Sequence, residues 1–239
     1  MSATRQTVVG VGLALAIIAA WTAVHAYALF FHRLEPSSLI VAPLLMAAAC
    51  WLNVGLFIIA HDAMHGSLAP LRPAVNRAVG RVALALYAGF WFDHLRVKHF
   101  EHHRRPGTAD DPDFSEHRRL LPWYAGFIRH YFGWPQFVVL AIATAALLLA
   151  GAPFANILLF WAAPAILSSL QLFYFGTYLP HRPDERDFAD EHRARSNAYG
   201  WLGSLLSCYH FGYHHEHHLA PHVPWWRLPA ERRLRAPAR

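Results

Sequence analysis

Four long apolar stretches constrain the fold of this chain more than any other feature of its sequence. They are the residue ranges 7–31, 37–60, 130–150 and 154–179. A run of about 17–25 mostly apolar residues is long enough to cross a bilayer as a helix, and lipid admits only helices or closed barrels. The sequence therefore predicts an all-α, polytopic membrane protein with four transmembrane helices.

The connections between these stretches predict two helical hairpins. Residues 32–36 join the first pair of stretches and residues 151–153 join the second. A fifth apolar segment, 78–92, has only 15 residues, so we expect a re-entrant or interfacial helix there. The stretch 7–31 exceeds the apolar region of a signal peptide, about 7–15 residues, and no clear cleavage site follows it, so we expect it to be retained. Residues 1–239 are thus predicted to form a single integral-membrane domain.

The charged residues agree with a membrane location and predict an orientation. Apolar residues make up 55% of the chain and charged residues 15%, against roughly 25% charged in ordinary globular proteins. If the histidine-rich segments are cytoplasmic, Arg33 is the one basic residue left on the far side. The positive-inside rule then places both termini and the C-terminal segment 180–239 in the cytoplasm.

The same pattern argues against two other classes of protein. The net charge is +6, but the arginines flank apolar runs and no motif that reads nucleic acid is present, so we expect membrane lipid and no nucleic-acid partner. Cys50 and Cys208 lie far apart in sequence, which does not indicate a disulfide framework.

Histidines are the second unusual feature, because 18 of them occur and eight of these, spaced three or four residues apart or adjacent to one so spaced, define three blocks, of which the third also contains His215. The blocks are His61-Asp-Ala-Met-His65, His99-Phe-Glu-His102-His103 and His214-His-Glu-His217-His218. Positions i, i+3 and i+4 share one face of a helix, so each block directs its imidazoles to one side. Imidazole is a ligand for iron, zinc, copper and nickel. Eight are too many for one zinc ion, which takes about four protein ligands or fewer, so the count predicts two metals.

The residues around the blocks carry a resemblance to a known enzyme family. The three blocks resemble the histidine boxes of the membrane-bound di-iron desaturase and hydroxylase superfamily. Longer strings over residues 37–229 resemble the bacterial β-carotene ketolase family within it. The strings are His61–Gly66, Gly107–Phe114, Phe175–Pro183, His214–His218 and Pro224–Pro229. One departure is Ala109, where many relatives carry an acidic residue.

The resemblance implies a set of metal ligands and of supporting residues. The implied ligands of two iron ions are His61, His65, His99, His102, His103, His181, His214, His217 and His218. His181 enters this set through its string and not through any spacing rule. Ligating histidines usually donate their other ring N–H to a carboxylate or carbonyl, and Asp111 and Asp113 are the candidates preferred here. We expect His210 and His215 to be supporting residues, and the histidines without block partners to be interfacial or solvated.

The reaction also follows from the resemblance. It implies an oxygenase that contains two Fe²⁺ ions, uses O₂ as co-substrate and receives electrons from ferredoxin or a similar carrier. Two hydroxylations at C4 of a β-ionone ring and loss of water would convert β-carotene through echinenone to canthaxanthin. The carotenoid would reach the metals from within the bilayer. Whether 3-hydroxylated rings are accepted, which decides astaxanthin formation from zeaxanthin, stays open, as does the oligomeric state.

Two other classes of function remain as alternatives. The same scaffold carries carotenoid 3-hydroxylation, fatty-acyl desaturation or hydroxylation, and alkane hydroxylation, and no spacing argument fixes which carbon is oxidised. A histidine-rich metal transporter is the third hypothesis. A transporter is expected to place ionisable groups at the middle of its spans, and the predicted spans have almost none.

Aromatic residues close to the motifs are candidates for lining the substrate passage. They are Phe90, Trp91, Phe92, Phe173, Phe175 and Tyr178. For any one of them, contact with lipid or with a neighbouring helix is the simpler interpretation.

Overall fold

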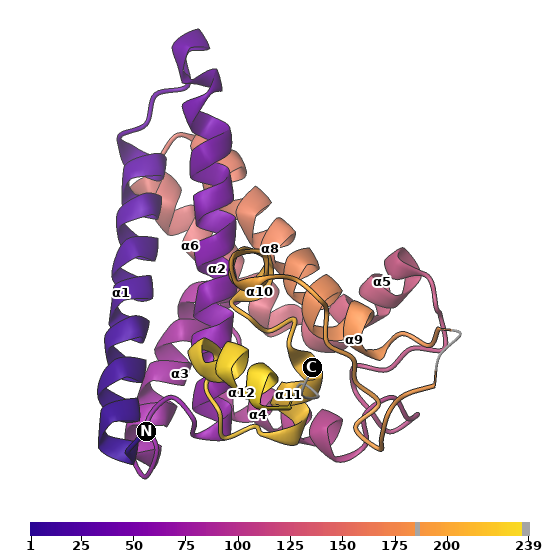
Figure 1. Cartoon of the computed structure of the whole chain (residues 1–239). Helices are drawn as coiled ribbons and strands as arrows, with labels where there is room; N and C mark the ends of the chain where they lie inside the picture. The colour runs from indigo at the N-terminus through magenta and orange to yellow at the C-terminus, as the bar shows by residue number, and fades with distance from the viewer. Residues whose placement is uncertain (185–186, 236–239) are drawn as a thin grey trace.

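The computed structural model describes residues 1–184 and 187–235, and within these ranges it contains helices and no strand, which confirms the all-α prediction. Helix α1 (Ala3–Phe30) and helix α2 (Val41–His65) form the first hairpin and lie side by side (Figure 1). Both are apolar enough and long enough to cross a membrane. The short 3₁₀ helix η1 (Pro36–Leu39) connects them at the end farthest from the histidines.

The fourth apolar stretch is also one continuous helical span, Phe154–His181, but it contains two π-helical turns. These turns are η2 (Leu158–Ala162) and η3 (Tyr174–Tyr178). Each turn is followed by a proline, Pro164 or Pro180. A proline ring clashes with the carbonyl four residues earlier, and that residue lies inside the preceding π turn in both cases. The widened turns therefore relieve the clash without breaking the span.

The remaining parts of this span are α-helical. They are α7 (Phe154–Ile157), α8 (Ala163–Phe173) and α9 (Leu179–His181). The span ends at a predicted ligand, His181, and its central helix α8 packs against α2.

The third apolar stretch differs from the prediction of a span over 130–150. Helix α5 (Leu120–Tyr131) and helix α6 (Trp134–Leu149) meet at a bend of 84°, and they qualify as a span only when taken together. Pro135 lies in the first turn of α6, where its missing N–H prevents the hydrogen-bond ladder of α5 from continuing. The described part of the chain thus has three helices that can cross a membrane, or four if the bent pair is one broken span.

The predicted interfacial helix over 78–92 is present but shifted. Helix α3 begins at Pro73 and ends at Ala88, because Gly89 adopts the left-handed conformation that ends helices. Helix α4 (Phe92–Arg104) follows in a new direction beneath α2 (Figure 1). A Cβ atom at Gly80 would lie 2.1 Å from the ring of Phe92, so this glycine permits α3 and the start of α4 to pack closely.

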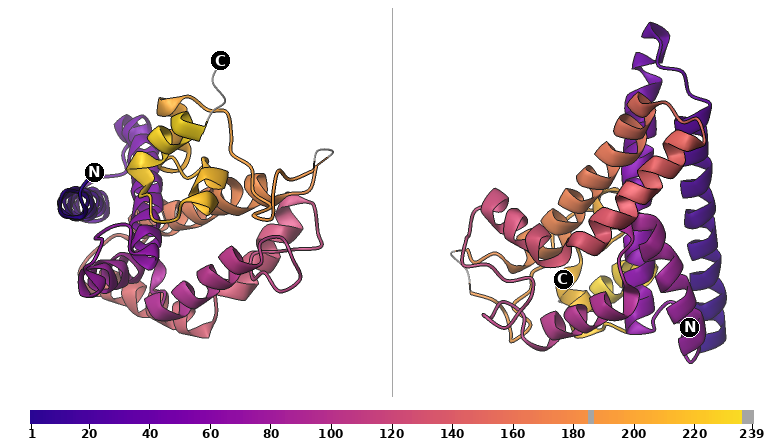
Figure 2. Two further views of the ribbon diagram at one scale, coloured as in Figure 1. Left: turned by 60° about the horizontal axis from the view of Figure 1, so that its bottom comes forward. Right: turned by 180° about the vertical axis from the view of Figure 1, so that it is seen from behind.

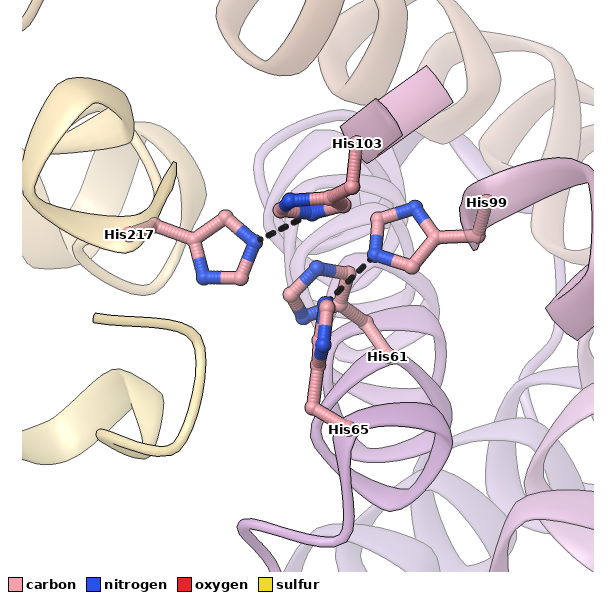
Figure 3. Close-up of side chains that lie close together, drawn as sticks. All are labelled: His61, His65, His99, His103 and His217. Carbon is pink, nitrogen blue, oxygen red and sulfur yellow. Dashed lines mark hydrogen bonds between the residues drawn. The ribbon is translucent and has the colours of Figure 1, made fainter. Parts of the chain in front are cut away.

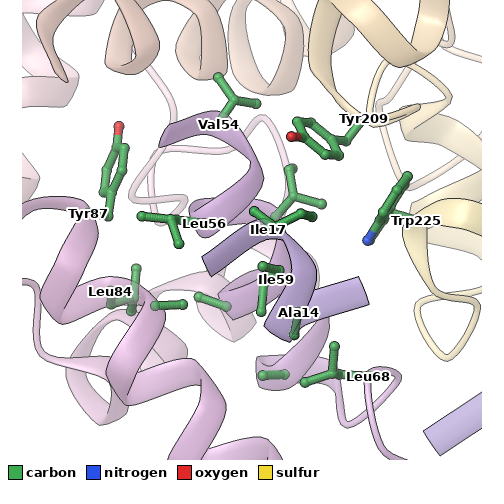
Figure 4. Close-up of a cluster of buried hydrophobic side chains, with 14 of the residues drawn as sticks. Ala14, Ile17, Val54, Leu56, Ile59, Leu68, Leu84, Tyr87, Tyr209 and Trp225 are labelled. Atoms are coloured by element: carbon green, nitrogen blue, oxygen red, sulfur yellow. The ribbon is translucent and has the colours of Figure 1, made fainter. Parts of the chain in front are cut away.

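The C-terminal segment folds against the histidine-bearing end of α2 (Figures 1 and 2). Its helices are α10 (Trp201–Cys208), α11 (His214–Leu219), η4 (Trp225–Arg227) and α12 (Leu228–Arg235). Tyr209 and Trp225 from this segment enter a core with residues of α1, α2 and α3 (Figure 4). The ring of Tyr209 stacks on Trp51 of α2 at 4.3 Å between centroids. This packing fixes α11 next to α2 and α4.

Candidate metal centre

All nine histidines predicted as metal ligands lie together, divided into two adjoining groups. The five-histidine group contains His61, His65, His99, His103 and His217. The four-histidine group contains His102, His181, His214 and His218. Within each group, one ring nitrogen per residue lies within 4.8 Å of the others. The two groups touch through the rings of His103 and His218, whose centroids are 4.3 Å apart.

The spacing within the blocks explains how two helices serve both groups. On α4, His99 and His103 are four residues apart and face the five-histidine group, whereas His102 faces the other. On α11, His217 faces the five-histidine group, whereas the i, i+4 pair His214 and His218 faces the other. An HxxHH block therefore distributes its three rings over two neighbouring sites.

The five-histidine group is built around the end of α2 (Figure 3). The Nε2 atoms of His65 and His99 are 2.6 Å apart, and those of His103 and His217 are 3.0 Å apart. The ring of His61 lies between them, and both of its nitrogens are buried without a hydrogen-bond partner. A neutral imidazole has one N–H donor and one lone pair. In each Nε2 pair, one ring at most can donate to the other, and the nitrogens of His61 have no partner within the protein.

The four-histidine group shows which nitrogens carry lone pairs. His102 donates its Nδ1–H to the carboxylate of Asp111 at 2.9 Å, and His181 donates its Nδ1–H to the backbone oxygen of Arg193 at 2.8 Å. In neutral rings, both Nε2 atoms are then acceptors. The Nε2 of His181 lies 2.9 Å from that of His214, and the Nε2 of His102 lies 3.3 Å from that of His218.

The donor sets of both groups fit a bound metal ion. Several buried imidazole lone pairs converge on one point in each group, and such an arrangement is costly unless a cation lies among them. Burial lowers the pKa of His99, His214, His217 and His218 well below the ordinary value, and neighbouring imidazoles lower it further. Burial and His102 lower the pKa of His103 to about 2. The rings are therefore held in the neutral form that binds metals.

His102 is the exception among these rings because two carboxylates face it. Burial opposes its charged form, but Asp113 and Asp111 outweigh burial and raise the pKa of His102. Asp111 is buried and accepts hydrogen bonds from His102, from the backbone N–H of Asp113 and, at 2.7 Å, from the backbone N–H of Gly107. A carboxylate held in this way orients the ring and makes it a stronger ligand.

Asp113 occupies a different position from Asp111. Its carboxylate lies 3.8 Å from His102 Nδ1 and accepts a hydrogen bond from the hydroxyl of Tyr131. Ala109, the departure from the family pattern, is exposed, and its neighbour Asp110 pairs with Arg105 at 2.5 Å. The structure thus places both predicted carboxylates beside the same histidine.

The two histidines expected to be supporting residues lie outside both groups. His210 is buried, and its ring lies parallel to that of Tyr213. His215 forms an ion pair with Asp190 at 2.7 Å on the partly exposed side of α11. The backbone oxygen of Arg193, which fixes the ring of His181, was not anticipated from the sequence. Every residue has a backbone carbonyl, so the sequence cannot indicate which carbonyl accepts the hydrogen bond from His181.

An apolar cavity of about 490 Å³ extends from both histidine groups between α2, α3, α5, α6 and α8. His61, His99, His102 and His214 form its polar end. Of the six aromatics proposed for a substrate passage, Phe90 lines the cavity and the other five do not. Part of the aromatic wall comes from α5, a helix that was not predicted from the sequence. Its residues on the wall are Tyr124, Phe127, Ile128 and Tyr131.

Comparison with known proteins gives consistent matches over nearly the whole chain. The family model described as "Fatty acid desaturase" matches residues 36–143 and 128–238. The β-carotene ketolase of Paracoccus sp. (strain PC1) is 50% identical over 96% of this chain and 95% of that protein. The β-carotene ketolase of Paracoccus sp. (strain N81106 / MBIC 01143) is 51% identical over 90% of this chain and 89% of that protein. A zeaxanthin 4-ketolase of Chlamydomonas reinhardtii is 40% identical over 96% of this chain and 54% of that protein.

Proposed function

Since the chain belongs to the fatty acid desaturase family, we propose that it is a β-carotene ketolase, an oxygenase that converts C4 of a β-ionone ring into a ketone. One observation carries this proposal above the others. Nine histidines form two adjoining groups at the end of an apolar cavity, in a chain half identical to β-carotene ketolases over almost its whole length. A metal transporter needs no such apolar cavity.

We assign one iron ion to each histidine group. All-nitrogen ligand sets suit iron, and zinc brings no redox chemistry for an oxygenation. The bound iron pair would supply O₂ activation, with electrons from an external carrier such as ferredoxin. Burial favours the neutral form of the ligand rings other than His102. The protein also orients His102 and His181 through Asp111 and the Arg193 carbonyl, and keeps bulk water from the buried four-histidine group.

The cavity provides the route by which a carotenoid ring reaches the histidine groups, where its C4 is oxidised. Ile166 lines the cavity and is 64% exposed on the outer face of the last span, so the cavity opens toward lipid. Each of two hydroxylations replaces a C4–H bond by C4–OH, uses one O₂, two electrons and two protons, and releases one water. The resulting gem-diol loses water and leaves the ketone. Repetition at the second ring gives canthaxanthin from β-carotene through echinenone.

The topology belongs to the same proposal. The chain acts as one domain in the cytoplasmic membrane of a bacterium, with the histidine groups and both termini in the cytoplasm. The N-terminus of α1 and the C-terminal helices lie at the histidine end of the molecule (Figure 1), while the loop that carries Arg33 lies at the opposite end. The basic residues are thereby concentrated on the side that the positive-inside rule assigns to the cytoplasm.

Expression in a β-carotene-producing bacterium tests this function. Chromatography of the extracted pigments is expected to give echinenone and canthaxanthin, and a His218→Ala variant at matched expression is expected to give neither. Zeaxanthin as the product would replace the proposal with 3-hydroxylation. Unchanged β-carotene in the presence of reductant would contradict carotenoid oxidation altogether. Zeaxanthin supplied instead of β-carotene tests the second substrate, which the 40% identical zeaxanthin 4-ketolase favours.

A further inference from the structure

The polar side chains on the cavity wall differ in whether their hydrogen-bonding capacity is already used. Tyr124 and Ser169 bond to each other, Tyr131 donates to Asp113, and Thr144 donates to a backbone oxygen of its own helix. Tyr87 interacts with Ser168. Thr177 is the exception, because its hydroxyl forms no hydrogen bond with any residue in the described part of the chain and, although the residue as a whole is only 5% exposed, the hydroxyl is open to the cavity.

Thr177 lies at the histidine end of the cavity. It belongs to the π turn η3 and precedes His181 by four residues, so the two residues lie on neighbouring turns of the same span. The adjacent Gly176 also lines the cavity, and a Cβ atom there would meet the ring of Phe211 at 3.0 Å. The ring of Phe211 in turn packs edge-on against His214 and His61, one from each group.

The π turn accounts for this placement. A π turn inserts one extra residue into an α-helix and shifts the face on which the following side chains lie, and such turns often occur at functional sites. Here the turn contains Thr177 and lies immediately before the residues that lead to His181. Among the described hydroxyl groups of the wall, that of Thr177 is thus the one left free to form a hydrogen bond with the oxygen of a ligand in the cavity.

We propose that the Thr177 hydroxyl binds the oxygen that the first hydroxylation places on C4 and holds the 4-hydroxy ring in place for the second. This inference rests on the proposed ketolase function and adds the residue that distinguishes two oxidations at one carbon from one. The hydroxyl of Thr177 donates to or accepts from the C4 hydroxyl. Without that bond, the singly hydroxylated carotenoid leaves the site before the remaining C4–H is oxidised.

Thr177→Val is the decisive variant because valine keeps the shape and removes only the hydroxyl. No hydrogen bond within the protein is lost, so the variant is expected to fold and to hold iron as the wild type does. We expect the ratio of 4-hydroxylated to 4-keto carotenoid to rise by roughly three- to tenfold, the effect of one neutral hydrogen bond. Thr177→Ser restores the hydroxyl and is expected to restore the wild-type ratio. Thr22→Val, at an exposed hydroxyl of α1 that lies outside the cavity and is already bonded to Ile18, is the matched control and leaves the ratio unchanged.

A binding measurement without turnover separates this inference from the proposed function. Purified protein without reductant is titrated with 4-hydroxylated carotenoid in detergent, and the dissociation constant is expected to rise by roughly three- to tenfold in Thr177→Val. Its affinity for β-carotene, which has no oxygen, is expected to stay the same. Equal product ratios and equal affinities in wild type and Thr177→Val would overturn the role of Thr177 and leave the ketolase proposal intact. Absence of any C4 oxidation in the wild type would instead overturn the ketolase proposal.

Discussion

The two histidine groups differ in how firmly the protein holds them. All four residues of the four-histidine group are buried, and two of them are anchored through Nδ1 by Asp111 and by the Arg193 carbonyl. In the five-histidine group, His65, His99 and His103 are partly exposed. Among the described residues, its hydrogen-bond contacts join only imidazoles of the group to one another, and the nearest carboxylate contact is 3.6 Å, from His61 to Asp62.

This difference indicates that the two groups depend on the metal to different degrees. Rings anchored from behind are directed at the metal position before it is filled, as in other metal sites where outer partners fix the ligands. Rings without such anchors are ordered by the metal itself. We therefore treat the four-histidine group as the preorganised site and the five-histidine group as the more adaptable one, and the predictions below test that distinction.

The largest effect is expected from removing a central ligand of the four-histidine group. The Nε2 of His218 contacts those of both His214 and His102, so His218→Ala leaves three rings around an enlarged space. We expect one of the two iron ions to be lost and ketone formation to fall below detection. His65→Ala leaves four rings in a partly exposed group, so we expect ketone formation to fall but to stay detectable. Iron analysis and pigment chromatography check both, and equal losses in the two variants would remove the distinction.

The next largest effect is expected from changing Asp111, which orients the candidate ligand His102 through a hydrogen bond. Asp111→Asn keeps the shape of the side chain but removes its charge, and one of its three accepted hydrogen bonds must be lost. We expect iron affinity to fall by about 10–100-fold, the usual result of changing the outer partner of a ligating histidine.

Asp110→Asn is the matched control for Asp111→Asn. Asp110 is the preceding residue in the chain, and it forms an exposed pair with Arg105 whose side chains are 64% and 67% exposed. Surface pairs of this kind contribute little, so iron affinity is expected to stay within about twofold of wild type. A similar loss of iron affinity in both aspartate variants would mean that iron binding depends on the turn as a whole and not on the hydrogen bond between Asp111 and His102.

Chelation distinguishes the groups in the unaltered protein. The five-histidine group is partly exposed and lacks anchors, so we expect a chelator to remove its iron first, with a rate on the order of tenfold higher than for the second ion. Iron content followed over time should therefore fall in two phases. In His65→Ala the fast phase should become faster while the slow phase stays unchanged. A single phase, or a change confined to the slow phase, contradicts the assignment.

The sequence anticipated the gathering of the histidines but not their division. Helical spacing puts His99, His102 and His103 on one side of α4, and the resemblance added His181, but spacing alone does not say which ring of α4 meets which ring of α11. That pairing depends on how the C-terminal segment packs through Tyr209 against Trp51 of α2, a contact between residues 158 positions apart in sequence.

The membrane-spanning part was predictable to different degrees along the chain. Continuous apolar runs identified α1, α2 and the span 154–181, because helices in lipid must satisfy their backbone internally. The bend of 84° between α5 and α6 was missed, although Gly133 and Pro135 lie at it, because hydrophobicity alone cannot distinguish a straight helix from a broken one. As a consequence the cavity wall formed by α5 was also missed.

The smallest effect is expected at Ala109, where the sequence departs from the family pattern. Ala109→Asp adds a carboxylate on the exposed side of the turn that carries Asp111. Asp111 already accepts three hydrogen bonds on the buried side, so the new charge stays in water, and iron affinity and ketone yield are expected to change by less than about twofold. Yields in matched cultures of wild type and Ala109→Asp measure this. A tenfold or larger gain in ketone yield would mean that an exposed charge on this turn alters iron binding by the four-histidine group. The hydrogen bonds of Asp111 would then not be sufficient to explain how tightly that group holds its iron.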